Sequence, residues 1–180
     1  MTAGGSVGLV ITLLVATGNK HKVEEIRAGL GAGFVVLSTR EVGLRLSPEE
    51  TGSTFAENAA IKSIACAGAL AASGSPGIEW VLADDSGLEV DALGGAPGVQ
   101  SARFAALDDG RTGNSLDGEN NAKLLRLLEG VPVEQRTARF RCVLALTPVL
   151  PASVEVLREA TRRFDGRCEG RIQMAEAGRG

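Results

Sequence analysis

The residues best suited to chemistry in this sequence are two adjacent carboxylates at the end of an apolar run. Asp84 and Asp85 follow the apolar residues 81–83. Paired acids suit the binding of a divalent cation or the activation of a water molecule. Because neighbouring residues of a strand point to opposite faces, we expect the two acids to do different jobs. A Ser-Gly turn is expected after them. The alternative is that the two acids belong to an Asp-rich turn that only ends a strand and has no role in catalysis.

A second polar segment follows the apolar run LVITLLVA, residues 9–16, which predicts a buried strand. A helix is expected next, with Val23, Ile26, Arg27 and Leu30 at helical spacing. Where a strand leads into a helix, backbone N–H groups and the helix dipole can face an anion. The spacing is not that of a Walker A loop, and a solvated loop is the alternative. The polar turn consists of Thr17, Gly18, Asn19, Lys20, His21 and Lys22.

Two more acids, Glu49 and Glu50, lie in the loop SPEETG, residues 47–52. Thr54 and Glu57 then have the spacing of a capping box, which predicts the start of an Ala-rich helix that runs to about residue 72. On this helix Lys62 is four residues after Asn58, so both lie on one face. They line a polar cleft if that face points inward, and have no such role if it is solvated.

The other elements predict an α/β domain with a βαβ unit near its start. Strands are expected over 34–37 and 136–147, the latter with Arg139 and Arg141 on one face. A helix is expected over 119–129, with four leucines as its core stripe. For residues 154–172 a twisted hairpin of strands is favoured over a helix. Neither a repeat nor a linker divides the sequence, so residues 1–180 are interpreted as one domain.

Composition narrows the range of functions. The chain has 180 residues, a net charge of −3 and a pI near 5.3, which argue against nonspecific binding to nucleic acid or to a membrane surface. No apolar run is long enough to span a membrane. Three cysteines without CxxC spacing indicate neither a disulfide framework nor a zinc site, and fit a reducing cytoplasm. A single histidine makes a metal-ion mechanism more probable than a histidine network.

In combination these motifs resemble a known family. The order A-T-G-N-x-x-K, E-E-T-G-x-T-F-x-E-N-A-x-x-K, A-D-D-S-G-L-x-V-D-A-L-x-G-x-P-G-V-x-S-A-R-F, N-x-x-K-L-L and A-R-F-x-C-V-L is similar to that of the non-canonical purine nucleoside triphosphate pyrophosphatases, which act on inosine and xanthosine triphosphates. The resemblance covers nearly the whole chain from Leu14 onward. It implies a two-lobed α/β fold with a long mixed central sheet, flanking helices, a nucleotide cleft between the lobes and a homodimer.

The resemblance also implies an activity and its residues. The family hydrolyses ITP, dITP and XTP to the monophosphate and pyrophosphate with Mg²⁺, as house-cleaning of the nucleotide pool. By position, Asp85 is the proton acceptor and a metal ligand, Glu50 is a metal ligand, and Asp84 shapes the second shell of the metal. Ser86, Lys62 and residues 17–22 contact the phosphates, with Lys22 favoured over Lys20. Asn120 is a further residue of the cleft.

The sequence departs from the family pattern at its end. Neither the G-F-G-Y-D-P motif nor the later S-H-R motif is present, and the sequence contains no tyrosine. These parts read the 6-oxo purine in the family, so we expect a chain truncated before them, with base recognition affected most. An inactive fragment that binds nucleotide weakly or only dimerises is therefore one alternative function. A related house-cleaning enzyme for a modified pyrimidine nucleotide is the other.

Overall fold

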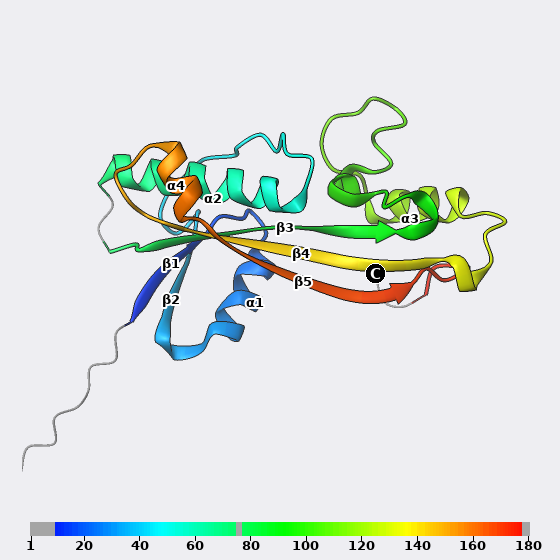
Figure 1. Ribbon diagram of the computed structural model, residues 1–180, viewed down its shortest axis with the longest axis horizontal. Coiled ribbons are helices and arrows are strands. Elements are labelled where there is room, and N and C mark those ends of the chain that lie inside the picture. Colours follow the sequence, from blue (N-terminus) through cyan, green and yellow to red (C-terminus); the bar gives the residue numbers. More distant parts are fainter. Residues whose placement is uncertain (1–9, 75–76, 178–180) are drawn as a thin grey trace, which may run out of the picture. The chain divides into compact units, whose positions relative to one another are not determined.

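Five strands form one sheet in the order β2-β1-β3-β4-β5 in the computed structural model, which describes residues 10–74 and 77–177 (Figure 1). The strands are β1 (Ile11–Val15), β2 (Phe34–Ser38), β3 (Trp80–Val90), β4 (Thr137–Pro148) and β5 (Arg162–Arg171). The α-helices are α1 (Lys20–Leu30), α2 (Phe55–Ser73), α3 (Asp117–Leu127) and α4 (Val154–Ala160). β1 is parallel to both β2 and β3, whereas β3, β4 and β5 run in alternating directions (Figure 1). The prediction of an α/β fold with a mixed sheet is confirmed.

The described residues group into two compact units. The first comprises residues 10–51, 58–74, 77–84 and 144–163, and the second comprises 52–57, 85–143 and 164–177. Strands β3, β4 and β5 each pass from one unit to the other, so each unit consists of several separate stretches of the chain. Each unit has its own core, and each is described by itself.

In the first unit, two helices cover opposite faces of the sheet (Figure 1). Leu14 of β1 is fully buried in a cluster with Ala67 of α2. Val15, the next residue, points the other way and packs with Val23 of α1 and Val36 of β2. This alternation explains why β1 reads as a continuous apolar run, because both of its faces are covered.

Three groups of the first unit donate hydrogen bonds to the Glu41 carboxylate. Its carboxylate accepts hydrogen bonds from the Ser38 N–H and hydroxyl, each at 2.7 Å, and from the Arg27 guanidinium at 2.6 to 2.9 Å. Hydrogen bonds from Ser38 and then from Arg27 lower the pKa of Glu41 from 4.5 to about 2. The ionised form of Glu41 is thus favoured in the folded state. Its carboxylate connects Arg27 of α1 to Ser38 at the end of β2.

We expect this carboxylate to make stability depend on pH below 4.5. A carboxyl whose folded-state pKa is lowered contributes stability fully above its unfolded-state pKa, and loses it as the pH falls towards about 2. Thermal unfolding of the wild type and Glu41→Gln between pH 6 and pH 2 is the measurement. The difference in melting temperature should be largest near pH 6 and shrink towards pH 2. Glu25→Gln, at an exposed position of α1, is the control and should follow the wild type. A constant difference for Glu41→Gln would contradict the linkage.

The predicted capping box at the start of α2 is confirmed. The Glu57 N–H donates to Thr54 Oγ1 at 3.2 Å, and the Thr54 N–H donates to Glu57 Oε2 at 3.1 Å. Ser53 adds its N–H and its hydroxyl to the same carboxylate. These hydrogen bonds satisfy donors that the first turn of a helix otherwise leaves unpaired.

The second unit has a core built on β3, α3 and β4. Buried residues of this core include Val90, Leu124, Leu128 and Ala138. The predicted helix over 119–129 begins two residues earlier, at Asp117, and ends at Leu127. Of the four leucines expected to form its core stripe, Leu127 is 46% exposed and does not belong to it.

The expected turn after the two central acids is wrong. β3 continues without interruption through Ser86 and Gly87 to Val90. Gly87 serves close packing instead, because a Cβ added there would lie 2.4 Å from Ser101 Oγ and 2.6 Å from the Gly98 carbonyl oxygen. Gly87, which suggests a turn in the sequence, instead lies inside β3 where the segment with Gly98 and Ser101 comes close to the strand.

The favoured hairpin for residues 154–172 is half wrong. Residues Val154–Ala160 form helix α4, and only Arg162–Arg171 form a strand, β5. Ser153 caps the helix by accepting a hydrogen bond from the Val156 N–H, and Leu157 is buried beneath it. The sequence VEVLREA is thus helical because its cap and one buried leucine outweigh its two valines.

Candidate active site

The polar turn before α1 is held by Asn19. Its side-chain oxygen accepts hydrogen bonds from the N–H groups of His21, at 2.9 Å, and Lys22, at 3.4 Å. Thr17 Oγ1 accepts from the Asn19 N–H at 3.1 Å. Gly18 has open space around its Cα. Asn19 is therefore the N-cap of α1, a role the sequence analysis did not assign to it.

The two lysines of this turn differ in their surroundings. The Lys20 side chain is 85% exposed and lies 3.6 Å from Glu24, one turn further along α1. The Lys22 ammonium instead forms a close ion pair with Asp84 of β3, whose side chain is only 7% exposed. A surface pair such as Lys20–Glu24 contributes little, whereas a buried carboxylate needs its partner.

A second lysine–carboxylate pair lies in the same unit. Lys62 Nζ of α2 is 3.2 Å from Glu50 Oε1, with the two side chains 17% and 31% exposed. Glu50 belongs to a segment without helix or strand, whereas Lys62 follows the fully buried Asn58 by one helical turn. The face of α2 that carries Asn58 and Lys62 thus points inward, and the solvated alternative does not hold.

Asp85 and Ser86 lie in the second unit, at neighbouring positions of β3. Asp85 is 9% exposed, and its Oδ1 accepts a hydrogen bond from the Ser86 N–H at 3.1 Å. A carboxylate at this depth on a strand has few rotamers to choose from, so the backbone fixes its direction. Such a fixed acid is suited to accept a proton or to bind a cation.

The carboxylates fit a magnesium ion by their chemistry. Mg²⁺ prefers oxygen ligands, keeps several waters, and is bound by one or two protein carboxylates together with phosphate oxygens. Within residues 10–74 and 77–177 no group of three or more His, Cys, Asp or Glu residues could hold a metal alone. Glu50 and Asp85 are acceptable ligands of this kind, and each belongs to a different unit.

Asn120 and Lys123, which carry the N-x-x-K-L-L motif, have structural partners. Asn120 Oδ1 accepts from the Ala105 N–H at 2.9 Å, and its Nδ2 donates to the Ala102 carbonyl at 3.4 Å. Lys123 Nζ donates to the Phe104 carbonyl at 2.6 Å. The expectation that Asn120 lines the cleft gains no support, because both ends of its amide hold the turn over residues 102–105.

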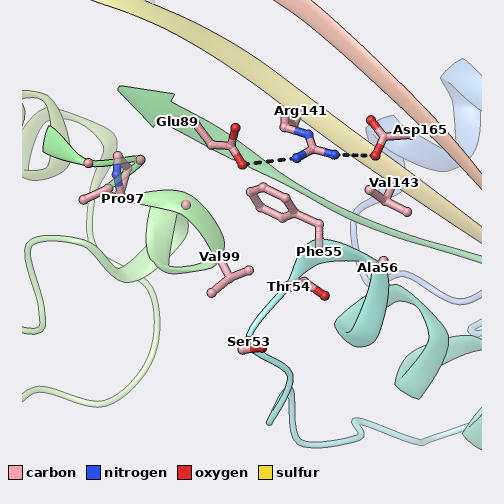
Figure 2. A pocket seen from close by; sticks show the side chains of 14 residues that line it. Ser53, Thr54, Phe55, Ala56, Glu89, Pro97, Val99, Arg141, Val143 and Asp165 are labelled. Atoms are coloured by element: carbon pink, nitrogen blue, oxygen red, sulfur yellow. Dashed lines mark hydrogen bonds and ion pairs between the residues drawn. The ribbon is translucent and has the colours of Figure 1, made fainter. Parts of the chain in front are cut away.

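The second unit also contains a pocket of about 590 Å³ that the sequence analysis did not find (Figure 2). Phe55, Val143 and the glycine-rich loop 94–98 contribute to its walls. Arg141 crosses it between two acids, with an ion pair to Asp165 and a 3.5 Å contact to Glu89 (Figure 2). The signal available in the sequence was the strand alternation that places Arg139 and Arg141 on one face. Their acidic partners on β5, Glu169 and Asp165, are likewise an even number of residues apart.

Comparisons with known proteins match nearly the whole chain. The profile of the Ham1 family matches residues 13–180. The dITP/XTP pyrophosphatase of Desulforamulus reducens is 47% identical in an alignment of 172 residues that covers 93% of this chain and 74% of the relative. The protein of the same name from Geobacillus kaustophilus is 44% identical over 169 residues, 93% of this chain and 72% of the relative.

Solved structures agree with these relatives. The Ham1 protein of Staphylococcus aureus superposes with a TM-score of 0.74 at 34% identity, over 94% of this chain and 76% of that one. A HAM1 protein from Coxiella burnetii gives a TM-score of 0.76 at 32% identity, over 95% of this chain and 77% of that one. Among the described helices, none is long and apolar enough to cross a membrane.

Proposed function

The chain belongs to the Ham1 family, and on this premise we propose that it hydrolyses the deaminated purine nucleoside triphosphates ITP, dITP and XTP to the monophosphate and pyrophosphate. The observation that carries the proposal is the 47% identity, over 93% of the chain, to a protein named dITP/XTP pyrophosphatase. The cellular role would be the removal of such nucleotides from the pool. Two lysine–carboxylate pairs in the first unit support it, because a triphosphate needs local cations on a chain of net charge −3.

The phosphate chain is assigned to the lysines and to the turn before α1. Lys22 and Lys62 supply positive charge, and both already face a carboxylate that keeps the ammonium in a defined place. Ser86 adds a hydroxyl from the second unit. The remaining donors proposed for the phosphates are Thr17, Gly18, Asn19, Lys20 and His21.

Magnesium is proposed as the cofactor, with Glu50 and Asp85 as its protein ligands. When bound, the ion would neutralise phosphate charge and polarise the phosphoryl group. Asp85 would in addition take the proton of the attacking water, for which its fixed direction on β3 is suited. Asp84 and Asp85 are adjacent on a strand and point to opposite faces, so Asp84 is not assigned the same task.

We also propose a cytoplasmic homodimer. The three cysteines Cys66, Cys142 and Cys168 are free thiols, as a reducing compartment favours. Light scattering of the purified chain measures the oligomeric state directly.

The test is release of pyrophosphate by this chain from ITP, dITP, XTP and ATP. With Mg²⁺ we expect faster turnover of the three deaminated nucleotides, which share a 6-oxo group, than of ATP, which has a 6-amino group instead. Removal of Mg²⁺ by EDTA should stop the reaction, and added Mg²⁺ should restore it.

Three other results of this assay would contradict the proposed function. Equal rates from ATP and ITP would overturn the assigned substrate class. A folded chain that binds ITP without releasing pyrophosphate would favour the inactive alternative. Turnover confined to a modified pyrimidine triphosphate would favour the related house-cleaning enzyme.

A further inference from the structure

We propose that Asp84 is a positioning residue that holds the Lys22 ammonium ready for the phosphate chain of the substrate, an inference that rests on the proposed function. The family resemblance implies that Asp84 shapes the second shell of a metal. The ion pair with Lys22, 62 residues away in sequence, assigns it a different partner.

The direction of Asp84 follows from the register of the sheet. Val15 of β1 pairs with Leu82 of β3, and paired residues of parallel strands point to the same side. Val15 packs on Val23 of α1, so Leu82 and, two residues on, Asp84 point to the side of α1. Lys22 precedes Val23, in the first turn of that helix.

The two partners differ in burial. The Asp84 side chain is 7% exposed, whereas that of Lys22 is 37% exposed. The carboxylate is therefore fixed by the strand and by burial, and the ammonium lies where solvent and a ligand can reach it. Loss of the ammonium would leave a buried charge without this partner, which is costly.

Fixing a lysine in advance strengthens its binding to an anion. A free lysine side chain loses much rotamer entropy when it is ordered, and a ligand that orders it gives up that part of its affinity. The ion pair with Asp84 orders the Lys22 side chain before the phosphate chain binds. Arg158 is an exposed cation on helix α4 of the same unit and has no place in the proposed site, so it is the control.

Binding of inorganic tripolyphosphate in EDTA buffer tests the inference without turnover or metal. Calorimetry would compare the wild type with Asp84→Asn, Lys22→Met, the double variant and Arg158→Met. We expect Asp84→Asn to weaken binding about fivefold, in the range found for contacting residues. Lys22→Met should weaken it about tenfold or more, and Asp84→Asn should add nothing to Lys22→Met. Arg158→Met should change it less than about twofold.

Several results would overturn the proposal. An equal effect of Asp84→Asn with and without Lys22 would mean that Asp84 acts independently of the lysine. Unchanged or tighter binding by Asp84→Asn would mean that the carboxylate does not prepare the site. If Lys22→Met bound tripolyphosphate like the wild type, the phosphate role of Lys22 in the proposed function would fail as well. Only the last result affects the proposed function.

A second variant and a kinetic measurement separate positioning from folding. Asp84→Glu keeps the charge but moves the carboxylate by one methylene group, and should give an intermediate loss of affinity. In turnover of ITP, Asp84→Asn should raise KM about fivefold with kcat within about twofold, since the lysine binds phosphate in both ground and transition states. A fall in kcat at constant KM would contradict positioning of the lysine.

Discussion

Replacement of Asp85 by asparagine is expected to reduce kcat for ITP by about 10³-fold, in the range found for a general base. An amide of the same shape cannot take the proton of the attacking water at neutral pH. The fold should remain, because the Ser86 N–H can donate to the amide oxygen as it now does to Oδ1. Pyrophosphate release with saturating ITP and Mg²⁺ is the measurement, and circular dichroism checks the fold.

Two controls accompany this variant. Asp109→Asn removes an exposed acid of the second unit, paired with Arg111 at the surface, and should leave kcat unchanged. A titration with Mg²⁺ up to high concentration asks whether weaker metal binding alone explains the loss. If Asp85→Asn hydrolyses ITP at the wild-type rate, the assigned proton acceptor is wrong.

Replacement of Arg136 by methionine is expected to destabilise the protein by about 3 to 5 kcal/mol, because a buried guanidinium loses three hydrogen bonds to carbonyl groups, one of them buried and two partly buried. Arg136 is 2% exposed. Its guanidinium donates to the carbonyls of Leu128 at 2.8 Å, Val131 at 2.9 Å and Gln173 at 3.2 Å. One side chain thus connects the end of α3 with the segment after β5, and methionine offers no donor to any of them.

Urea unfolding followed by circular dichroism measures this loss. Arg167→Met, at a side chain 70% exposed with a 3.5 Å surface contact to Glu169, is the matched control and should change stability by less than about 0.5 kcal/mol. A loss below about 1 kcal/mol for Arg136→Met would show that water replaces the guanidinium at the three carbonyls.

The sequence alone was sufficient for the elements with a strong local signal. The apolar run of β1, the capping box at Thr54 and Glu57, and the alternation of Arg139 and Arg141 all depend on neighbouring residues. The capping box and the alternation are present as predicted. Strand β1 spans Ile11–Val15 within the predicted 9–16, of which residue 9 lies outside the described residues. Family motifs likewise identify Lys22, Lys62 and Asp85 as candidates. The roles of these residues in catalysis stay predictions.

Local patterns failed where a distant segment decides the conformation. Ser86 and Gly87 have the composition of a turn, yet they continue β3, because the glycine accommodates the Gly98 carbonyl and the Ser101 hydroxyl. The segment after Ser153 has valines typical of a strand, yet it is helical with Leu157 buried beneath it. In both places packing against residues far along the chain outweighs the local preference.

The sequence could not predict the partners of charged groups either, because these partners also lie far along the chain. The sequence determined that Asp84 and Asp85 differ, since adjacent strand residues face opposite sides. Only the tertiary structure decided that Asp84 meets Lys22, and that Arg136 binds three carbonyls. A buried charge requires a partner, but which residue supplies it depends on the register of the sheet and on how each helix packs against it.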